Sequence, residues 1–155
     1  MKTLAVFFGG KSNEHDISVI TGMFCCNLLQ RSELRVVPVY LPKEGGMRLC
    51  RACSVEEFRD PRDGKKFLPV YLDGRDLVLC KRHKRVEKLD CALNCCHGGA
   101  GEDGTLSALL RWHGVPFASP DAAVSSVFIN KEFSQIAARG LGIPVARSFA
   151  VSERE

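Results

Sequence analysis

The sequence predicts an α/β domain with an open, mainly parallel Rossmann-like sheet, flanking helices and an inserted hairpin region. An apolar run near the N-terminus ends at a glycine pair, as buried parallel strands often do. A segment of helical periodicity and a second apolar run follow, which favours a right-handed β-α-β crossover. Of the 155 residues, 45% are hydrophobic and 26% charged, so disorder and coiled coil are poor explanations.

The first part of the chain supplies this β-α-β unit. Residues 3–8 are apolar and meet a glycine pair, which predicts a buried strand stopped by a loop. Residues 17–30 carry apolar side chains at helical spacing, so we expect an amphipathic helix. The side chains of its expected apolar stripe are Ile17, Ile20, Thr21, Phe24 and Leu28. Residues 35–41 form the next strand, where Pro38 predicts an edge or a bulge because it cannot donate to a ladder.

The middle of the chain has a different pattern. Residues 67–72 and 77–80 flank Asp73-Gly74, a strong hairpin signal. Residues 42–88 therefore resemble an insertion of short antiparallel strands and loops into the α/β pattern.

The net charge of +4 comes from one short run inside this insertion. Residues 81–88 hold five lysines and arginines against one glutamate, and the rest of the chain is balanced. A nucleic-acid interface would depend on this run, but no aromatic residue interleaves with its basic ones. We therefore interpret it as a solvated hairpin end or a charged strand edge, and expect no nucleic-acid partner.

The α/β pattern resumes after the insertion. Residues 89–95 are the next strand, and a glycine-rich loop follows over residues 97–104. Thr105 can cap a short helix at its N-terminus, and residues 115–118 are a further short strand. The side chains expected to point inward from that helix are Leu106, Leu109 and Leu110.

A second helix is expected after Lys131. Its shared face would carry Phe133, Ile136 and Ala137. Gly140 is the expected C-cap, since glycine commonly ends helices.

Two segments have features of nucleotide-binding loops. Residues 10–12 resemble the end of a P-loop, but Ala5 stands where that motif needs glycine, so we reject it. Residues 99–104 satisfy the G-x-G-x-x-G pattern between a strand and a helix. Two carboxylates inside that loop would face a pyrophosphate, and the nearest downstream acid, Asp121, lies in a turn beyond the next strand. A dinucleotide site is therefore a weak alternative.

Eight cysteines raise the question of disulfides or zinc. The N-terminal apolar run is too short for a signal-peptide core and nothing else could span a membrane, so we expect a cytoplasmic protein with reduced thiols. Cys50 and Cys53 have C-x2-C spacing, whereas the second potential ligand group lacks it. That second group is Cys91, Cys95, Cys96 and His97. Buried free thiols are the favoured interpretation, and we assign no metal ligands.

Two strand-to-loop junctions carry the clearest chemistry. Glu14 follows the first strand and His97 follows the strand over residues 89–95. In an open α/β sheet, ligands bind beyond the carboxyl ends of neighbouring strands. If these strands are neighbours, a carboxylate and an imidazole meet in one crevice, which suits a zwitterion: Glu14 could hold an ammonium and His97 a carboxylate or developing anion.

These junctions resemble those of a known family. Residues 9–18, GGKSNEHDIS, are similar to the N-terminal signature of D-alanine–D-alanine ligases, members of the ATP-grasp superfamily. Residues 97–108, HGGAGEDGTLSA, match that family's H-G-x-x-G-E-[DN]-G pattern. Asn130-Lys131 and the later GIPV at residues 142–145 are similar to the start of its ATP-grasp domain. The resemblance implies the family's N-terminal, pre-ATP-grasp domain.

The family joins two D-alanines with ATP and magnesium, through an acyl phosphate that the second amine attacks, to make a peptidoglycan precursor. The resemblance implies that Glu14 is a catalytic residue that anchors the amino group of the first D-alanine. Ile17 would touch that substrate's methyl group, and His97 would lie near its carboxylate and stabilise developing charge. Lys131 would contact the ATP phosphates.

The resemblance also implies a division of the chain. Residues 1–121 would be the substrate-binding α/β domain, with the insertion at 42–88. Residues 122–155 would hold a linker helix and the start of a truncated ATP-grasp domain. Family members are about twice as long, and the acidic magnesium ligands lie in the part missing here. We therefore expect this chain alone to be inactive.

Several alternatives stay open. The chain could be part of a ligase that makes D-Ala-D-Lac or D-Ala-D-Ser. It could instead be a stand-alone module that binds a small ligand or zinc. The resemblance further implies a possible homodimer in a bacterial cytoplasm, with D-alanine as ligand and no membrane partner.

Overall fold

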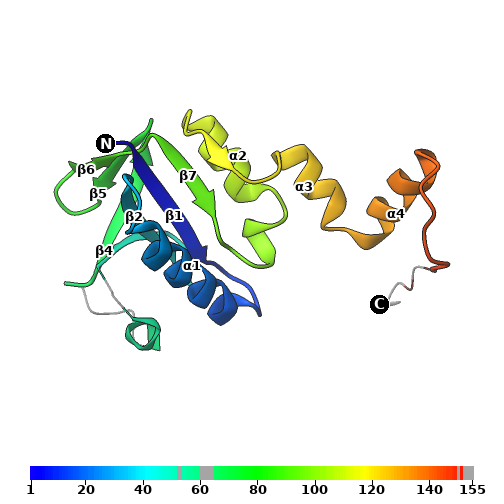
Figure 1. Cartoon of the computed structure of the whole chain (residues 1–155), viewed down its shortest axis with the longest axis horizontal. Coiled ribbons are helices and arrows are strands. Elements are labelled where there is room, and N and C mark those ends of the chain that lie inside the picture. Colours follow the sequence, from blue (N-terminus) through cyan, green and yellow to red (C-terminus); the bar gives the residue numbers. More distant parts are fainter. Residues whose placement is uncertain (52–53, 60–64, 150, 152–155) are drawn as a thin grey trace.

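The computed structural model describes residues 1–51, 54–59, 65–149 and 151. Within these residues, eight strands form one sheet in the order β6-β5-β4-β3-β2-β1-β7-β8 (Figure 1). The strands are β1 (Thr3–Gly9), β2 (Arg35–Leu41), β3 (Met47–Cys50), β4 (Phe67–Asp73), β5 (Asp76–Leu79), β6 (Lys84–Lys88), β7 (Cys91–Asn94) and β8 (Phe117–Ala118). The α-helices are α1 (His15–Leu29), α2 (Thr105–Trp112), α3 (Ala122–Phe128) and α4 (Lys131–Gly140). Two short 3-10 helices are η1 (Val55–Arg59) and η2 (Gly99–Gly101).

The sheet has a parallel part and an antiparallel part. Strands β2, β1, β7 and β8 are parallel to one another, which confirms the expected open α/β sheet. Strands β3 to β6 form an antiparallel meander that extends the same sheet from β2. The insertion thus contains the predicted hairpin, β4 and β5, and two further strands beside it.

Strand β1 lies at the centre of the parallel part and is buried along its whole length. On one side of the sheet, Ala5 and Phe7 join an apolar cluster that includes Leu106 and Leu110 of α2. On the other side, Val6 and Phe8 join a cluster that includes residues of α1. The two helices therefore cover opposite faces, as alternating strand side chains require.

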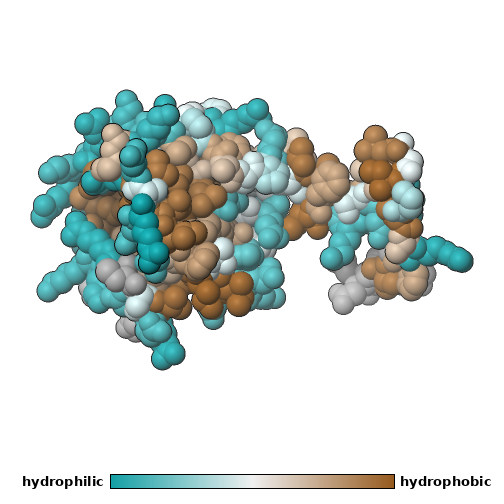
Figure 2. All heavy atoms as spheres, viewed as in Figure 1, coloured by the Kyte–Doolittle hydropathy of each residue, from teal (hydrophilic) through white to brown (hydrophobic). Residues whose placement is uncertain are grey.

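Helix α1 was predicted correctly, but its buried face was not. The expected stripe is exposed, with Phe24 65% and Ile17 54% accessible. The sheet instead receives residues on another side of the helix: His15, Ser18, Val19, Gly22, Met23 and Cys26. Gly22 lies where the helix meets a bulky side chain of β1: a Cβ added to Gly22 would lie 2.2 Å from Cγ of Phe8. Figure 2 shows hydrophobic side chains exposed in the region of α1.

Pro38 does not mark an edge strand. Strand β2 is interior, between β1 and β3. Its pairing with β3 involves Val39 and Tyr40, beyond the proline, so the missing N–H costs no hydrogen bond to β3. The predicted edge is therefore wrong for the strand as a whole.

Two helix caps also differ from the prediction. The N-cap of α2 is Gly104, at a φ of 95°, and Thr105 is the first helical residue. The backbone N–H of Thr105 donates to the Asp103 carboxylate at 2.8 Å, so a side chain of the loop satisfies this first helical N–H. The C-cap of α4 is Leu141, not Gly140. Gly142, at a φ of 72°, supplies the left-handed conformation that follows it.

Helices α3 and α4 form an arm that extends away from the sheet (Figure 1). Neither helix contains a buried residue, and α3 was not predicted as a separate helix. Hydrophobic side chains are visible along the arm in Figure 2. The arm therefore depends on local contacts at its start.

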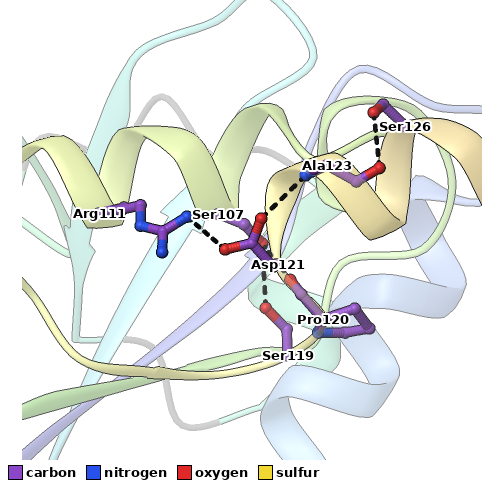
Figure 3. Close-up of polar contacts among 7 residues, drawn as sticks. All are labelled: Ser107, Arg111, Ser119, Pro120, Asp121, Ala123 and Ser126. Atoms are coloured by element: carbon purple, nitrogen blue, oxygen red, sulfur yellow. Dashed lines mark hydrogen bonds and ion pairs between the residues drawn. The ribbon is translucent and has the colours of Figure 1, made fainter.

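The start of the arm is fixed to α2 through Asp121 (Figure 3). The Asp121 carboxylate caps α3 by accepting from the N–H of Ala123 at 3.0 Å, and it pairs with Arg111 of α2. The hydroxyl of Ser107 donates to the carbonyl of Pro120 at 3.0 Å and lies 3.1 Å from the Ser119 hydroxyl. Asp121, weighed above as a nucleotide-binding acid, therefore has a structural partner.

The basic run forms the turn after β5 and the edge strand β6, as its interpretation as a charged strand edge predicted. Within it, Glu87 pairs with Arg35 of β2 and Arg85 with Asp76 of β5. Among the described residues, no helix is both long and apolar enough to cross a membrane.

Candidate functional site

The candidate site lies where the strand order reverses. The chain adds β2 on one side of β1 and β7 on the other, and both pairings are parallel. Ligands in open α/β sheets bind beyond the carboxyl ends of strands at such a point. The loop after β1 carries Glu14, and the segment after β7 carries His97. The sequence analysis assumed that these two strands are neighbours, and the pairing of β1 with β7 confirms it.

Ser18 of α1 joins the ends of these two strands. Its hydroxyl accepts from the backbone N–H of Gly9 at 2.6 Å and donates to the carbonyl of Cys95 at 2.9 Å. Ser18 is fully buried, so this one hydroxyl satisfies a backbone group of β1 and another just after β7. Sequence reasoning missed Ser18 because its partners are non-local.

His15 fixes the first loop against β2. Its Nδ1 lies 2.7 Å from the carbonyl oxygen of Gly10, which can only accept, so Nδ1 carries the proton. Nε2 lies 3.1 Å from the Tyr40 hydroxyl oxygen, within hydrogen-bond distance. Burial raises the pKa of Tyr40 to about 12, which keeps that hydroxyl available as a donor. His15 is itself buried and supports the loop from beneath.

The two loops touch through Gly98. A Cβ added there would lie 2.6 Å from Oγ of Ser12 and 3.0 Å from Oε2 of Glu14. Gly98 also has a φ of 66°, a conformation that favours glycine. The Glu14 carboxylate therefore lies against the backbone that immediately follows His97, and Glu14 itself is exposed.

The His97 ring is held by α1. Its Nε2 lies 2.9 Å from Oγ1 of Thr21, within hydrogen-bond distance, and both residues are half-buried. Thr21 was assigned from sequence to an apolar helix stripe, and this polar role was missed. One helix thus holds both loops, through Ser18 and Thr21.

The glycine-rich loop is shaped by side chains from its own ends. The Asn94 side-chain amide donates to the carbonyl of Gly101 at 2.7 Å, and its oxygen accepts from the N–H of Cys96 at 3.0 Å. The Asp103 carboxylate accepts from the first N–H of α2, where the positive end of the helix dipole favours a negative charge. These contacts give the G-x-G-x-x-G pattern a structural role.

Lys131 is the predicted site residue that the fold sets apart. It is the first residue of α4, in the arm, whereas Glu14, Ile17 and His97 are beside the ends of β1 and β7. Figure 1 shows α4 well separated from α1. Lys131 lines a cavity of about 380 Å³ with Arg139 and Phe149 within the arm.

Two other cavities flank the loops. One of about 490 Å³ lies between α1, the segment after β2 and η1, and includes Tyr40 and Phe58 among its lining residues. The other, of about 450 Å³, lies between the glycine-rich loop and α3, and includes Glu102 and Phe128. Neither cavity is lined by Glu14 or His97, so these two side chains lie outside both cavities.

The potential metal ligands are dispersed in the described part of the chain. No three histidine, cysteine, aspartate or glutamate side chains there come together to hold a metal ion. Burial raises the pKa of Cys26 and Cys96 to about 12, which keeps them protonated. Cys53, one half of the C-x2-C pair considered for zinc, lies outside the described residues.

Fold and site together define a class of protein: an open α/β domain in which a carboxylate-bearing loop and a histidine-bearing loop meet at a strand-order reversal. Residues 3–120 match the family model described as the D-ala D-ala ligase N-terminus, and the chain belongs to this family.

Individual relatives agree with this assignment. A D-alanine–D-alanine ligase of Chloroherpeton thalassium is 29% identical over 163 residues, covering 99% of this chain and 44% of the relative. One from Streptomyces avermitilis is 30% identical over 167 residues, covering 98% and 43%. The chain therefore spans less than half the length of these curated relatives.

Solved structures are similar as well. The D-alanine–D-alanine ligase of Helicobacter pylori has a TM-score of 0.79 and 27% identity, covering 92% of this chain and 43% of that one. The enzyme of Coxiella burnetii has a TM-score of 0.86 and covers 100% of this chain and 46% of that one. At 24% identity, this second likeness supports the fold alone.

Proposed function

We propose that this chain is the N-terminal, substrate-binding part of a D-alanine–D-alanine ligase. The complete enzyme would join two D-alanines with ATP, through an acyl phosphate, to make a peptidoglycan precursor in the cytoplasm. The observation that carries the proposal is the contact of two loops at the ends of parallel strands, one with Glu14 and the other with His97. Family membership over residues 3–120 supports it.

Three of the site residues would bind the first D-alanine. The exposed Glu14 carboxylate would pair with the substrate's ammonium group through charge-assisted hydrogen bonds. Ile17, one helical turn further along and exposed, would contact the methyl group. The His97 ring would lie near the substrate carboxylate, oriented by Thr21, and stabilise negative charge as the carboxylate reacts.

ATP would supply the phosphoryl group that activates this carboxylate. Lys131 is exposed at the N-terminus of α4, where a lysine can reach phosphate oxygens, and we assign it to ATP. The described residues contain no carboxylate cluster that fits magnesium, so its ligands are not assigned to this part of the chain. We therefore propose no metal-dependent step through these residues.

The division of the chain is part of the same proposal. Residues 1–121 would form the substrate-binding domain, and residues 122–155 would begin the ATP-grasp part. The cap at Asp121 supports this boundary, because the chain leaves α2 and the sheet there (Figure 3).

D-alanine binding to the 155-residue chain tests the proposal. In a ¹H–¹⁵N NMR titration, D-alanine should shift the resonances of Glu14, Ile17 and His97, and L-alanine should shift them much less. Glu14→Gln should weaken binding about tenfold or more, since a hydrogen bond to a charged group contributes about 1.5–3 kcal/mol. Ser126→Ala, at an exposed hydroxyl in α3, is the control and should bind normally.

Two results would contradict the proposal. One is an equal response to both alanine enantiomers, and the other is binding that Glu14→Gln leaves unchanged while the variant keeps its melting temperature. We expect no phosphate release from this chain with ATP and D-alanine, because the chain covers 44% of a ligase and its described residues offer no magnesium site.

The proposal includes a homodimer that uses the exposed side of α1. Ile20, Phe24 and Leu28 are 50%, 65% and 57% accessible and lie along one side of the helix. Two copies related by a two-fold axis can bury the same stripe on each other. Light scattering during gel filtration should give twice the monomer mass, and Phe24→Asp should halve it. Phe149→Asp, in the arm, should not change it, and a monomeric wild type would contradict the dimer.

A further inference from the structure

Two cysteines that are distant in sequence are neighbours beneath the candidate site. Cys25 belongs to α1, and Cys95 immediately follows β7. Burial and then the neighbouring Cys25 thiol raise the pKa of Cys95, and both side chains pack in the apolar cluster between α1 and the sheet. Neither cysteine is in a disulfide. The pair therefore joins the same two segments that Ser18 holds together.

The position of Cys25 on the helix ties the pair to the site. Ser18, Thr21 and Cys25 follow one another at intervals of three and four residues, so they share one side of α1. Ser18 binds the carbonyl of Cys95, Thr21 binds His97, and Cys25 contacts the Cys95 thiol. Cys95 is two residues from His97, so a covalent bond at the pair would act on the segment that carries His97.

The two cysteines differ in exposure. Cys25 is half-buried, whereas Cys95 is 6% exposed. Burial raises the pKa of Cys95 to about 12, so its thiol stays protonated at neutral pH. A small oxidant would therefore meet Cys25 first, with Cys95 as the adjacent thiol that resolves the product.

We propose that Cys25 and Cys95 form a reversible, hydroperoxide-sensitive disulfide that links α1 to the His97 loop. The Cys25 sulfur attacks one peroxide oxygen and the O–O bond breaks. The proton of the Cys25 thiol passes to the departing hydroxide, so the products are a sulfenic acid and water. The Cys95 sulfur then attacks the Cys25 sulfur, the S–S bond forms, and the sulfenic oxygen leaves with the Cys95 proton as water. Two electrons pass from the two thiols to one peroxide, and a dithiol reductant reverses the change.

Other cysteines provide internal comparisons. Cys26 and Cys50 also interact, but both are buried, so peroxide reaches neither directly. Cys80 is exposed after β5, in the antiparallel part of the sheet. Oxidation of Cys80 should therefore show that peroxide has reached the protein. The proposal does not depend on ligase activity, since it concerns only the thiols and their positions.

Graded hydrogen peroxide treatment of the intact 155-residue chain tests the proposal. After alkylation in denaturant and digestion, mass spectrometry should find a peptide pair that joins Cys25 to Cys95 and is lighter by two hydrogens. Dithiothreitol should release it. Cys25→Ser and Cys95→Ala should each abolish it, and Cys80→Ser should not. The His97 ring signals should shift on oxidation in the wild type and not in Cys25→Ser.

Three results would overturn the proposal. In the first, Cys80 is oxidised while Cys25 remains free for alkylation. In the second, Cys25 reaches sulfinic acid with Cys95 unmodified. In the third, the cross-link joins a different pair of cysteines. Circular dichroism of each variant checks that a missing cross-link does not reflect misfolding. Cys25→Ser changes a half-buried position, where a substitution disturbs the packing less than it would at a buried one.

Discussion

Gly22 shows how one missing side chain determines the position of a helix. Phe8 is fully buried in the central strand, and its ring occupies the space where a Cβ on Gly22 would be. The backbone of α1 can therefore approach the sheet closely. This approach brings Ser18 and Thr21 within hydrogen-bond distance of the two site loops.

We predict that Gly22→Ala destabilises the protein by about 1–3 kcal/mol or more, because overpacking a close-packed core has that cost. Urea denaturation measures the loss. Gly140→Ala is the matched control: it is also helical, but nothing lies within 4 Å of its added Cβ. It should be neutral or stabilising by up to about 1 kcal/mol, since alanine favours the helix. Equal destabilisation by both changes would contradict the packing argument.

Because several thiols are buried, we predict that the free energy of unfolding falls at alkaline pH. Burial raises the pKa of Cys26, Cys95 and Cys96 from 9.0 to about 12. The folded protein therefore keeps these protons when the unfolded chain releases them. Unfolding free energy should be constant below about pH 8 and fall as pH rises from about 9 towards 12, by about 1 kcal/mol per thiol at about pH 10.

Urea denaturation under reducing conditions at a series of pH values measures this slope. Cys26→Ala should make the slope shallower, because it removes one buried thiol. Cys80→Ser should leave it unchanged, because Cys80 is exposed. A slope that responds equally to both variants would show that the burial of Cys26 is not its cause.

At the level of elements, the strands were easier to predict than the faces of the helices. The apolar run of β1 and the hairpin of β4 and β5 are local signals, and both are present in the structure. Helix α1 has apolar residues on two sides, so periodicity alone favoured the wrong one. Its buried side contains Ser18 and His15, whose polar groups are satisfied by distant backbone and by Tyr40. Such partners exist only after the sheet has formed.

The residues of the candidate site also differ in how far the sequence predicts them. Glu14 and His97 were found from sequence because each follows a strand, and strand ends meet at one edge of a parallel sheet. Thr21 and Ser18 were missed because nothing in their local sequence indicates what they bind. The roles of Glu14, Ile17, His97 and Lys131 remain proposals that the D-alanine titration and nucleotide binding can test.

Helix α3 should depend strongly on its N-cap. Asp121→Ala removes the carboxylate that accepts from Ala123, and loss of an N-cap costs about 1 kcal/mol. Hydrogen exchange of the α3 amides should speed up about fivefold, while exchange in α1 stays unchanged. Asp121→Asn keeps a capping oxygen and removes the charge that pairs with Arg111, so it should have a smaller effect. Similar acceleration in both variants would indicate that the ion pair dominates.

At the scale of the molecule, the body and the arm should differ in stability. No residue of α3 or α4 is buried, whereas both apolar clusters are formed by elements before residue 122. A chain that stops after Asp121 should therefore fold and keep its unfolding free energy to within about 1 kcal/mol. Calorimetry and urea denaturation test this. Failure of the shortened chain to fold would show that the arm contributes to the core.

The two outer strands of the sheet determine how copies of the protein can meet. An exposed edge normally invites another strand to add to it, which leads to aggregation. Here β8 is only two residues long, and β6 carries Lys84, Arg85 and Lys88 along the opposite edge. Neither edge is a good template for intermolecular strand pairing. Concentrated protein should therefore resist fibril formation, and association between copies should proceed through helix α1.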